Sequence, residues 1–395
     1  MLISRIDPVI DAGVFTIAFA IGNLMMAIGK YGIRQFQVSD VEEKYSFKEY
    51  TAARIITSII MIAASFVYVG VNLASGLYNS SKSIVIILIC LAKVIDAVED
   101  VIHGMFQQYL RLDVAGKILS IRMCTYIFVY LVCYYFSKNL ILTSAVALFV
   151  SFIQFVILNY TAIRGFEIKK KTFEIKSVKN IFVECFPLFI ASYLVIYIGN
   201  APKYAIDKVM SSEAQACFTY IFMPVFVISL LSQFVYQPVI SKMALLWHEK
   251  KISQFNKLIL RQIALILLLS VAAIIGGYLL GIPVLSLIYG VDLTDYKKAL
   301  VILLIGGGAL AIVNFLQMII TVARKQKLLN IGYLLAFLLF VFGGKTITEK
   351  YGMIGISVFY TAVVMILGAV FIVLTIAIIK GYVNSDGKTV AEKKQ

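Results

Sequence analysis

Hydrophobic runs long enough to cross a lipid bilayer recur along almost the whole of this 395-residue sequence. A membrane-spanning helix needs about 20 mostly apolar residues, because the hydrocarbon core is about 30 Å thick and each helical residue rises about 1.5 Å. Eleven runs are long enough, at residues 13–29, 54–74, 83–108, 118–137, 139–163, 181–200, 216–239, 258–287, 297–323, 328–345 and 352–380. The sequence therefore predicts an all-α integral membrane protein with about eleven transmembrane helices and no soluble domain.

The composition agrees with lipid as the main solvent. Hydrophobic residues make up 61% of the chain and charged residues 14%, whereas soluble domains are about half apolar and about a quarter charged. The net charge of +15 could suit a nucleic-acid partner, but the basic residues lie between the hydrophobic runs. That placement is typical of membrane topology signals, so we expect membrane lipids and no nucleic acid as partners.

The basic residues alternate strictly between the two sides of the predicted membrane. One set of alternate connections, which includes the C-terminal tail, holds 26 lysines and arginines, and the other set holds nine. Lys93 lies inside a helix and completes the total of 36. Because basic connections stay in the cytoplasm, we predict a multi-pass protein of the cell membrane with its N-terminus outside and its C-terminus inside.

A short repeat indicates two related halves. Residues 6–9 read IDPV and precede GVFT and a spanning run, and residues 206–209 read IDKV and precede ACFT and another run. The match fits a tandem duplication whose halves share one orientation, and chance is the alternative for so short a match. Only the second copy follows a spanning run. This predicts a five-helix lobe at 1–163 lacking its first helix, a basic cytoplasmic linker at 164–180, a six-helix lobe at 181–380 and a cytoplasmic tail at 381–395.

Polar residues form a stripe on the third predicted helix, which is continuously apolar only from Ile84 to Ala92. At 100° per residue, five side chains fall within about an 80° arc. These are Lys93, Asp96, Asp100, His103 and Gln107. Charges at this depth are expensive in lipid. We therefore expect the stripe to line a polar cavity between the lobes, with a purely structural Lys93–Asp96 ion pair as the alternative.

Other polar residues lie near the ends of predicted helices. Arg122 is expected to extend to the cytoplasmic surface. Glu184 is interpreted either as a cavity acid or as an interfacial residue. Arg5, Lys203 and Asp207 occupy matching places near the outer face of the two halves, where they are either cavity residues or simply solvated.

Sequence signatures of common enzymes are absent. The chain has no GxxxxGK[ST] phosphate loop, no HExxH and no GxSxG motif. Its five cysteines and two histidines show no metal-ligand spacing. We therefore predict no metal, no cofactor and no catalytic residue, and favour transport over enzymatic activity.

Four segments resemble one transporter family. They are GVFTIAFAIGNLMMAIGKYGIRQFQVSDV (13–41) with YSFKEY (45–50), GMFQQYLRLDVAGKILSIR (104–122), PKYAID (202–207) with FMPVFVISLL (222–231), and the amphipathic link ALLWHEKKISQFNKLI (244–259). Together they are similar to bacterial Wzx-type oligosaccharide flippases of the MATE-like multidrug/oligosaccharidyl-lipid/polysaccharide (MOP) exporter superfamily. Residues 3–13 resemble the end of the family's first helix, so the remainder of that helix is expected to be missing.

The resemblance implies a V-shaped bundle of two six-helix lobes around a central cavity. It also implies a substrate, a polyprenyl-diphosphate-linked oligosaccharide that is moved to the outer leaflet for surface polysaccharide assembly. Arginine and lysine would hold the diphosphate. Lys93 is the first cationic candidate, followed by Arg5 and Arg34, which fall where the family carries arginines in its first two helices. Arg34 is equally interpretable as a topology-determining residue.

Two other classes of function stay open. An ion-coupled small-molecule exporter on the same fold would use Asp96, Asp100 or Glu184 as the site for H⁺ or Na⁺. A polysaccharide polymerase or membrane glycosyltransferase is the enzymatic alternative. The short external connections disfavour it, because a polymerase usually has a large external loop.

Overall fold

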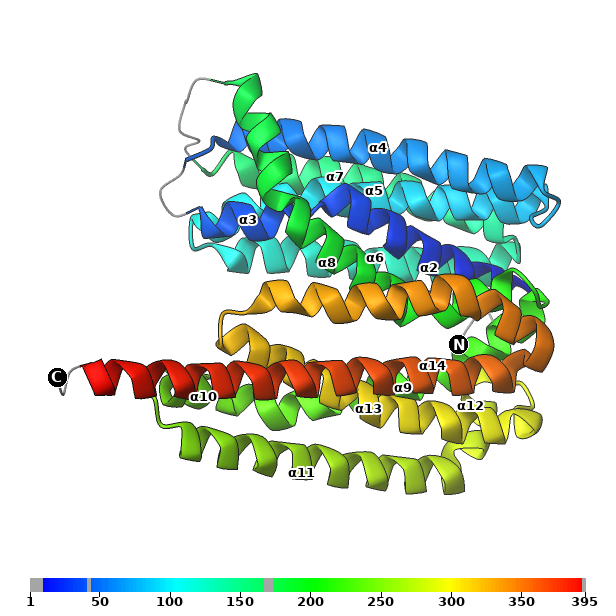
Figure 1. Cartoon of the computed structure of the whole chain (residues 1–395). Helices are drawn as coiled ribbons and strands as arrows, with labels where there is room; N and C mark the ends of the chain where they lie inside the picture. The colour runs from blue at the N-terminus through cyan, green and yellow to red at the C-terminus, as the bar shows by residue number, and fades with distance from the viewer. Residues whose placement is uncertain (1–9, 41–43, 167–172, 393–395) are drawn as a thin grey trace. The chain divides into compact units, whose positions relative to one another are not determined.

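The computed structural model describes residues 10–40, 44–166 and 173–392, with side-chain surroundings up to Gly381. The described residues form helices and short connections, without a strand (Figure 1). Contacts group the chain into two compact units, Met1–Asn200 and Ala201–Gln395. The prediction of an all-α fold is confirmed.

The first unit is built around its most polar long helix. Its helices are α2 (Ile10–Lys30), α3 (Ile33–Ser39), α4 (Phe47–Ala74), α5 (Ser80–Gln108), α6 (Leu112–Ser137), α7 (Leu140–Ile163) and most of α8 (Ile175–Asp207). Helix α5 packs against α2, α3, α4, α6 and α7. Its charged side chains are thereby removed from lipid, where each would cost several kcal/mol, about 2.5–3.5 on insertion scales.

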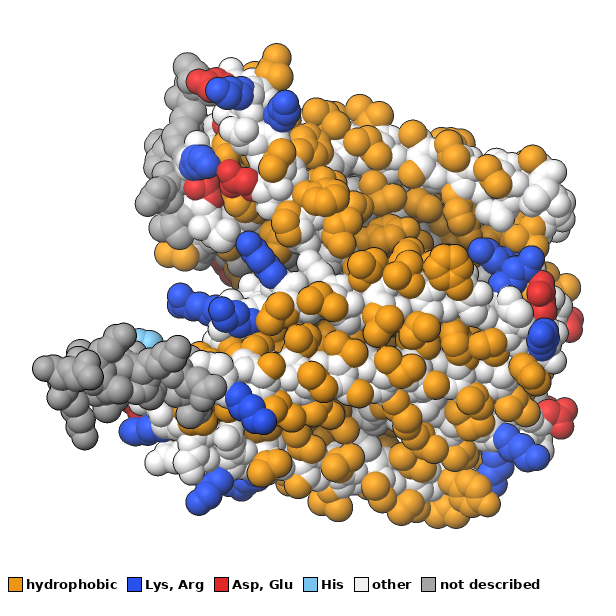
Figure 2. Space-filling model, viewed as in Figure 1, with side chains coloured by type: hydrophobic (Ala, Val, Ile, Leu, Met, Phe, Trp, Pro, Cys, Tyr) orange, Lys and Arg blue, Asp and Glu red, His pale blue; other side chains and the backbone are white. Residues whose placement is uncertain are grey.

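The outer helices of this unit carry apolar side chains on their free faces. Ile59 of α4, Phe128 of α6 and Phe149 of α7 are each 60–66% exposed. Figure 2 shows hydrophobic side chains along the helices, with lysine and arginine gathered towards the helix ends. An apolar surface of this kind suits contact with lipid hydrocarbon.

The second unit is built around α13 (Lys297–Val322). The other elements are α9 (Ser212–Tyr236), η1 (Gln237–Val239), α10 (Ile240–His248), α11 (Ile252–Gly276), the π-helical turn η2 (Gly277–Gly281), α12 (Ile282–Tyr289), η3 (Thr294–Tyr296), η4 (Gln326–Leu328) and α14 (Leu329–Glu392). Helix α13 packs against α9, α11 and α14. A Cβ atom on Gly307 would lie 3.1 Å from the Val225 backbone of α9, so a small residue permits this approach.

Helix α14 consists of two arms. Gly352 between them is non-helical, with φ 60° and ψ −147°, and Figure 1 draws the chain bending back within α14. In the described part of the chain, nine helical stretches are long and apolar enough to span a membrane. Helix α5 is not among them because of its charges, and one stretch, Gln326–Gly381, contains both arms. Adding α5 and the second arm gives the eleven helices that the sequence predicts.

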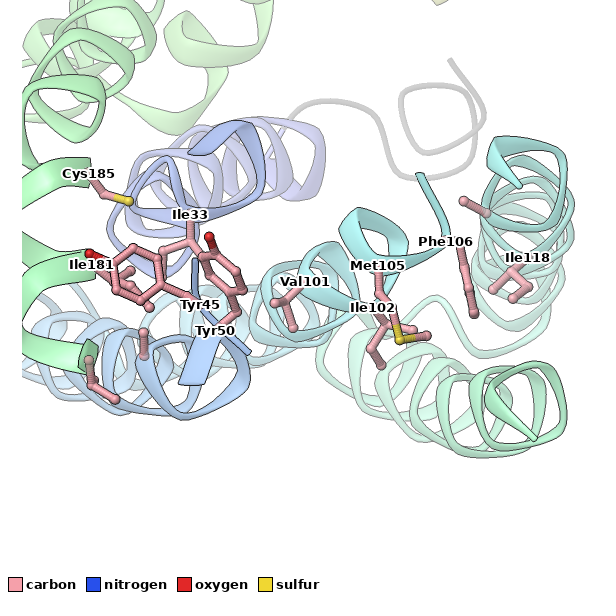
Figure 3. Packing of buried hydrophobic residues seen from close by; sticks show 13 residues of the cluster. Ile33, Tyr45, Tyr50, Val101, Ile102, Met105, Phe106, Ile118, Ile181 and Cys185 are labelled. Carbon is pink, nitrogen blue, oxygen red and sulfur yellow. The ribbon is translucent and has the colours of Figure 1, made fainter. Parts of the chain in front are cut away.

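A hydrophobic cluster joins five helices of the first unit at one end (Figure 3). Ile33 of α3 and Tyr50 of α4 lie close to Ile181 and Cys185 of α8, and Phe106 belongs to the α5 side of the cluster. The cluster fixes the position of α3, which carries Arg34.

Candidate functional site

A break between α2 and α3 creates the site. Tyr31 and Gly32 both adopt left-handed backbone conformations, with φ of 47° and 70°. A Cβ atom on Gly32 would lie 2.7 Å from the Leu188 Cβ of α8, so only glycine fits there. The Tyr31 ring stacks on Phe189 with ring centroids 4.6 Å apart. The break therefore separates Lys30 from Arg34 while α8 packs directly beside it.

A cavity of about 610 Å³ lies at this break, within the first unit. Its lining combines charged and amide side chains with apolar ones: Met26, Ala27, Lys30, Gly32, Arg34, Gln35, Val38, Asp100, Gln107, Ser192 and Ile196. The residues come from α2, α3, α5 and α8. We call this cavity the α2/α3 pocket.

One carboxylate in the α2/α3 pocket is surrounded by three cations. Asp100 lies 3.6 Å from Lys30 Nζ, 3.5 Å from Arg34 Nη1 and 3.0 Å from Arg54 Nη2. Arg54, on α4, is fully buried behind Asp100. With all four groups charged, the cluster carries a net charge of +2 and attracts anions.

Neighbouring contacts hold these cations in place. Arg54 Nη1 also donates to the Gly29 carbonyl, which accepts a 2.7 Å hydrogen bond from Thr57. Arg34 Nη2 donates to Gln107 Oε1 at 3.0 Å. The site is therefore largely organised before any ligand binds, which reduces the cost of binding.

The end of α3 is also linked to the residues that precede and begin α4. Asp40 accepts hydrogen bonds from the backbone nitrogens of Lys44 and Tyr45, at 2.8 and 3.0 Å, and from Tyr50 Oη at 2.8 Å. Tyr45 and Tyr50 belong to the cluster in Figure 3. These contacts limit the movement of α3 relative to α4.

A second charged network crosses from α5 to α6 and α7. Arg122 Nη2 lies 2.6 Å from Asp96 and 2.7 Å from Glu99, and its Nη1 donates to Ser151 at 3.1 Å. Asn159 donates to the other Glu99 oxygen at 2.9 Å. Because Lys93 pairs with Asp96 at 3.0 Å, two cations balance two carboxylates in this Arg122 network.

Lys93 lies between α5 and α2. A Cβ atom on Gly22 would lie 3.2 Å from Lys93 Cγ, and Lys93 Nζ lies 4.5 Å above the Phe19 ring. The Lys93–Asp96 ion pair, given above as the alternative to a cavity-lining role, is present. Of the stripe on α5, Asp100 and Gln107 line the α2/α3 pocket; Lys93 and Asp96 belong to the Arg122 network. His103 lies 4.0 Å from Glu99.

The remaining candidates lie elsewhere. Glu184 is 38% exposed, and it accepts hydrogen bonds at 3.1 Å from both Lys44 and Tyr45, so the interfacial interpretation fits its position. Hydrogen bonds with Tyr45 and Glu184 raise the pKa of Lys44 above its ordinary value. Lys203 and Asp207 are buried in the second unit, at 8% and 6% exposure, so simple solvation is wrong for both.

Two more expectations concern arginines. Arg5 lies outside the described residues. The expectation that Arg122 extends to the membrane surface is wrong: its side chain is 2% exposed, because Asp96 and Glu99 bind it inside the unit.

Sequence reasoning missed Lys30, Arg54 and Glu99 as members of these networks. Lys30 and Arg54 lie at the two ends of the basic connection between the first two predicted helices, and the sequence pattern indicates only their positive charge there. The helical spacing could have placed Arg54 on the inward face of α4. Its side chain lies on the same face as Ser58, Met61 and Ser65, at spacings of 4, 7 and 11, and all four residues are buried. Among the described residues, no group of His, Cys, Asp or Glu is placed to hold a metal ion.

Comparison with known proteins supports the fold. No family model matches the sequence. The chain is 23% identical to the capsular polysaccharide biosynthesis protein CapF of Staphylococcus aureus, over 91% of this chain and 90% of that protein.

Solved structures extend the comparison. An inward-facing multidrug-resistance MATE-family transporter of the MOP superfamily gives a TM-score of 0.68 at 12% identity, covering 96% of this chain and 93% of the other. The lipid II flippase MurJ, in an inward closed conformation, gives 0.71 at 13% identity, covering 94% and 82%. The predicted MATE-like fold is therefore confirmed, and the chain is a multi-pass membrane protein with the fold of MATE and MOP-superfamily transporters.

Proposed function

We propose that this protein is a flippase that moves a polyprenyl-diphosphate-linked oligosaccharide from the cytoplasmic to the outer leaflet for surface polysaccharide assembly. One observation carries the proposal: within a membrane-spanning unit, Asp100 of the α2/α3 pocket pairs with three cations, of which Lys30 and Arg34 line the pocket and Arg54 is buried behind it. A diphosphate is the complementary ligand, since arginine and lysine form strong charge-assisted hydrogen bonds with phosphate oxygens. The likenesses to CapF and to the lipid II flippase MurJ support the same substrate class.

The pocket suggests how the head group is bound. Lys30 and Arg34 are 39% and 29% exposed, so both can leave Asp100 and contact an incoming phosphate. Asp100 keeps its 3.0 Å ion pair with buried Arg54. The substrate thus competes with Asp100 for two of its three partners, and this competition couples binding to a local rearrangement.

The sugar part of the proposed substrate needs polar groups that replace water inside the membrane. Sugar hydroxyls lose hydrogen bonds to water when they enter hydrocarbon, at a cost of several kcal/mol each, about 4–8 in cyclohexane. The amides of Gln35 and Gln107 and the hydroxyl of Ser192 line the same pocket and replace part of that water. In a cell with a negative interior, outward movement of negative charge is favoured by about 2.3 kcal/mol per charge per 100 mV.

An ion-coupled small-molecule exporter is the second candidate, because the multidrug-resistance transporter has the same fold. The charge of the α2/α3 pocket disfavours a cationic drug, which would have to compete with three cations for Asp100.

A rescue experiment tests the proposed function. In a strain lacking the gene, we expect lipid-linked oligosaccharide to accumulate in the inner leaflet and this chain to restore surface polysaccharide. Arg34→Gln should fail to rescue. Arg111→Gln is the matched control, because Arg111 is exposed and pairs with Asp113 outside the pocket. Equal rescue by both variants would contradict the assignment, and drug efflux without oligosaccharide accumulation would favour the second candidate.

A further inference from the structure

A second polar cavity lies in the second unit, at the end of α13. It has a volume of about 950 Å³ and is bounded by the α13–α14 connection, the second arm of α14 and α10. Its basic residues are Arg324, Lys325 and Lys327, and its apolar wall includes Leu374, Ile378 and Trp247. We call this cavity the α13/α14 pocket; it is separate from the site proposed for the oligosaccharide.

The positive charge of the α13/α14 pocket is not balanced by the described residues. Arg324, Lys325 and Lys327 are exposed, and within the described part of the chain none of them is in an ion pair. Residues 382–395 contain Asp386 and Glu392 but three lysines, a net charge of +1. The sequence after Gly381 therefore adds one formal positive side-chain charge.

The backbone presents these three cations in a tight turn. Arg324 N donates to Thr321 O at 2.9 Å and Lys325 N donates to Ile320 O at 3.1 Å, the pair of bonds that closes a Schellman motif. Arg324 occupies the left-handed position of this motif, with φ 58°. Glycine is the usual residue there, so the arginine is kept at a conformational cost.

We propose that the α13/α14 pocket binds the phosphate head group of an anionic phospholipid. The phosphate contacts the basic turn, and an acyl chain lies against Leu374 and Ile378 of α14. The Trp247 ring lies tilted against Phe255, with ring centroids 5.2 Å apart, in a position typical of tryptophan at the boundary between head groups and hydrocarbon. An apolar wall next to the cations favours a lipid over free phosphate, and the proposal does not depend on the identity of the transported substrate.

The single tryptophan of the chain provides a direct measurement. The full-length protein is reconstituted in bilayers that contain brominated phosphatidylglycerol or brominated phosphatidylcholine, and quenching of Trp247 fluorescence reports lipid binding. We expect a relative binding constant at least about tenfold higher for phosphatidylglycerol, because each basic residue near an anionic surface contributes about fivefold. Arg324→Gly should lower this preference about fivefold, and R324G/K325Q/K327Q should bring it close to one.

Lys250→Gly is the matched control. Lys250 is also a basic residue at the left-handed position of a helix-ending turn, with φ 60°, but it does not line the pocket. Both substitutions relieve backbone strain, so loss of folding does not explain a difference between them. We expect K250G to keep the lipid preference.

Excess inorganic phosphate, at constant ionic strength, distinguishes the two sources of a phosphate group. We expect it to leave the preference for phosphatidylglycerol unchanged. Equal quenching by both lipids in the wild type, or an unchanged preference in R324G, would overturn the proposal. An Arg324-dependent response of Trp247 to free phosphate, with loss of the lipid preference, would overturn it in favour of a soluble phosphorylated ligand.

Discussion

Arg122 of α6 connects α5 and α7 through the Arg122 network. Its replacement by methionine tests whether this network stabilises the packing of the first unit. Arg122 binds Asp96, Glu99 and Ser151, which lie on two different helices. Arg122→Met leaves Asp96 with Lys93, 3.0 Å away. Glu99, which is 1% exposed, keeps only Asn159 at 2.9 Å and His103 at 4.0 Å.

The size of the effect follows from the uncompensated charge. Removal of one partner from a buried ion pair costs about 3–5 kcal/mol, because the other charge stays buried. For a unit of about 200 residues, 1 kcal/mol corresponds to about 2–4 °C in Tm, so we expect Tm to fall by about 6–20 °C. The double variant R122M/E99Q should recover most of this loss, because it restores charge balance and keeps an acceptor for Asn159.

Buried cysteines provide the assay. Cys90 and Cys185 are buried in the first unit and Cys217 in the second, whereas Cys124 is exposed. A thiol-reactive dye that fluoresces on reaction therefore reports thermal unfolding of the purified protein, best in a background without Cys124. A melting curve of R122M that matches the wild type, or a double variant no more stable than R122M, would refute the structural role of this network.

Three further predictions concern single positions. Leu110→Gly should stabilise the protein by about 1 kcal/mol, because Leu110 is 91% exposed and has a left-handed backbone conformation with φ 58°. The variant should therefore have a higher Tm than the wild type, and a lower Tm would contradict this prediction. Lys93→Ala should weaken the proposed oligosaccharide export without loss of membrane insertion, since Asp96 keeps Arg122, and Lys93→Arg should retain part of that activity. Normal export by Lys93→Ala would make Lys93 purely structural. A cysteine at Lys138 should react with an impermeant reagent in intact cells, and one at Lys250 only after permeabilisation; the reverse pattern would invert the predicted topology.

The sequence predicts the helices of this protein more completely than its candidate site. Apolar runs of sufficient length predicted the eleven helices, because lipid leaves the backbone few alternatives to a helix. The 100° spacing on α5 places Asp100 and Gln107 on one face, and both line the α2/α3 pocket, whereas Lys93 and Asp96 of the same stripe belong to the Arg122 network. It could not identify Arg54, because that contact joins residues 46 positions apart and depends on how α4 packs against α5. The pocket itself depends on the left-handed Tyr31 and Gly32, which hydrophobicity does not reveal.

The duplication stays a prediction, and the packing within each unit can be compared with the register it predicts. Helices α2, α4 and α5 pack on one another in the first unit, as α9, α11 and α13 do in the second. This is the correspondence that the predicted register requires, with α5 matching α13. The contacts place most of α8 with the first unit, whereas the duplication assigns it to the second lobe. The lobe boundary at residues 164–180 stays a prediction.

Direct binding of a polyprenyl diphosphate to the purified full-length protein tests the central claim that the α2/α3 pocket recognises an anionic head group. We expect Arg34→Gln to weaken binding about 10- to 150-fold, the effect of losing one charged hydrogen bond of about 1.5–3 kcal/mol. Arg111→Gln should leave the Kd unchanged. An unchanged Kd for Arg34→Gln in a normally folded protein would contradict the claim, as would binding of a cationic amphiphile that the polyprenyl diphosphate does not displace.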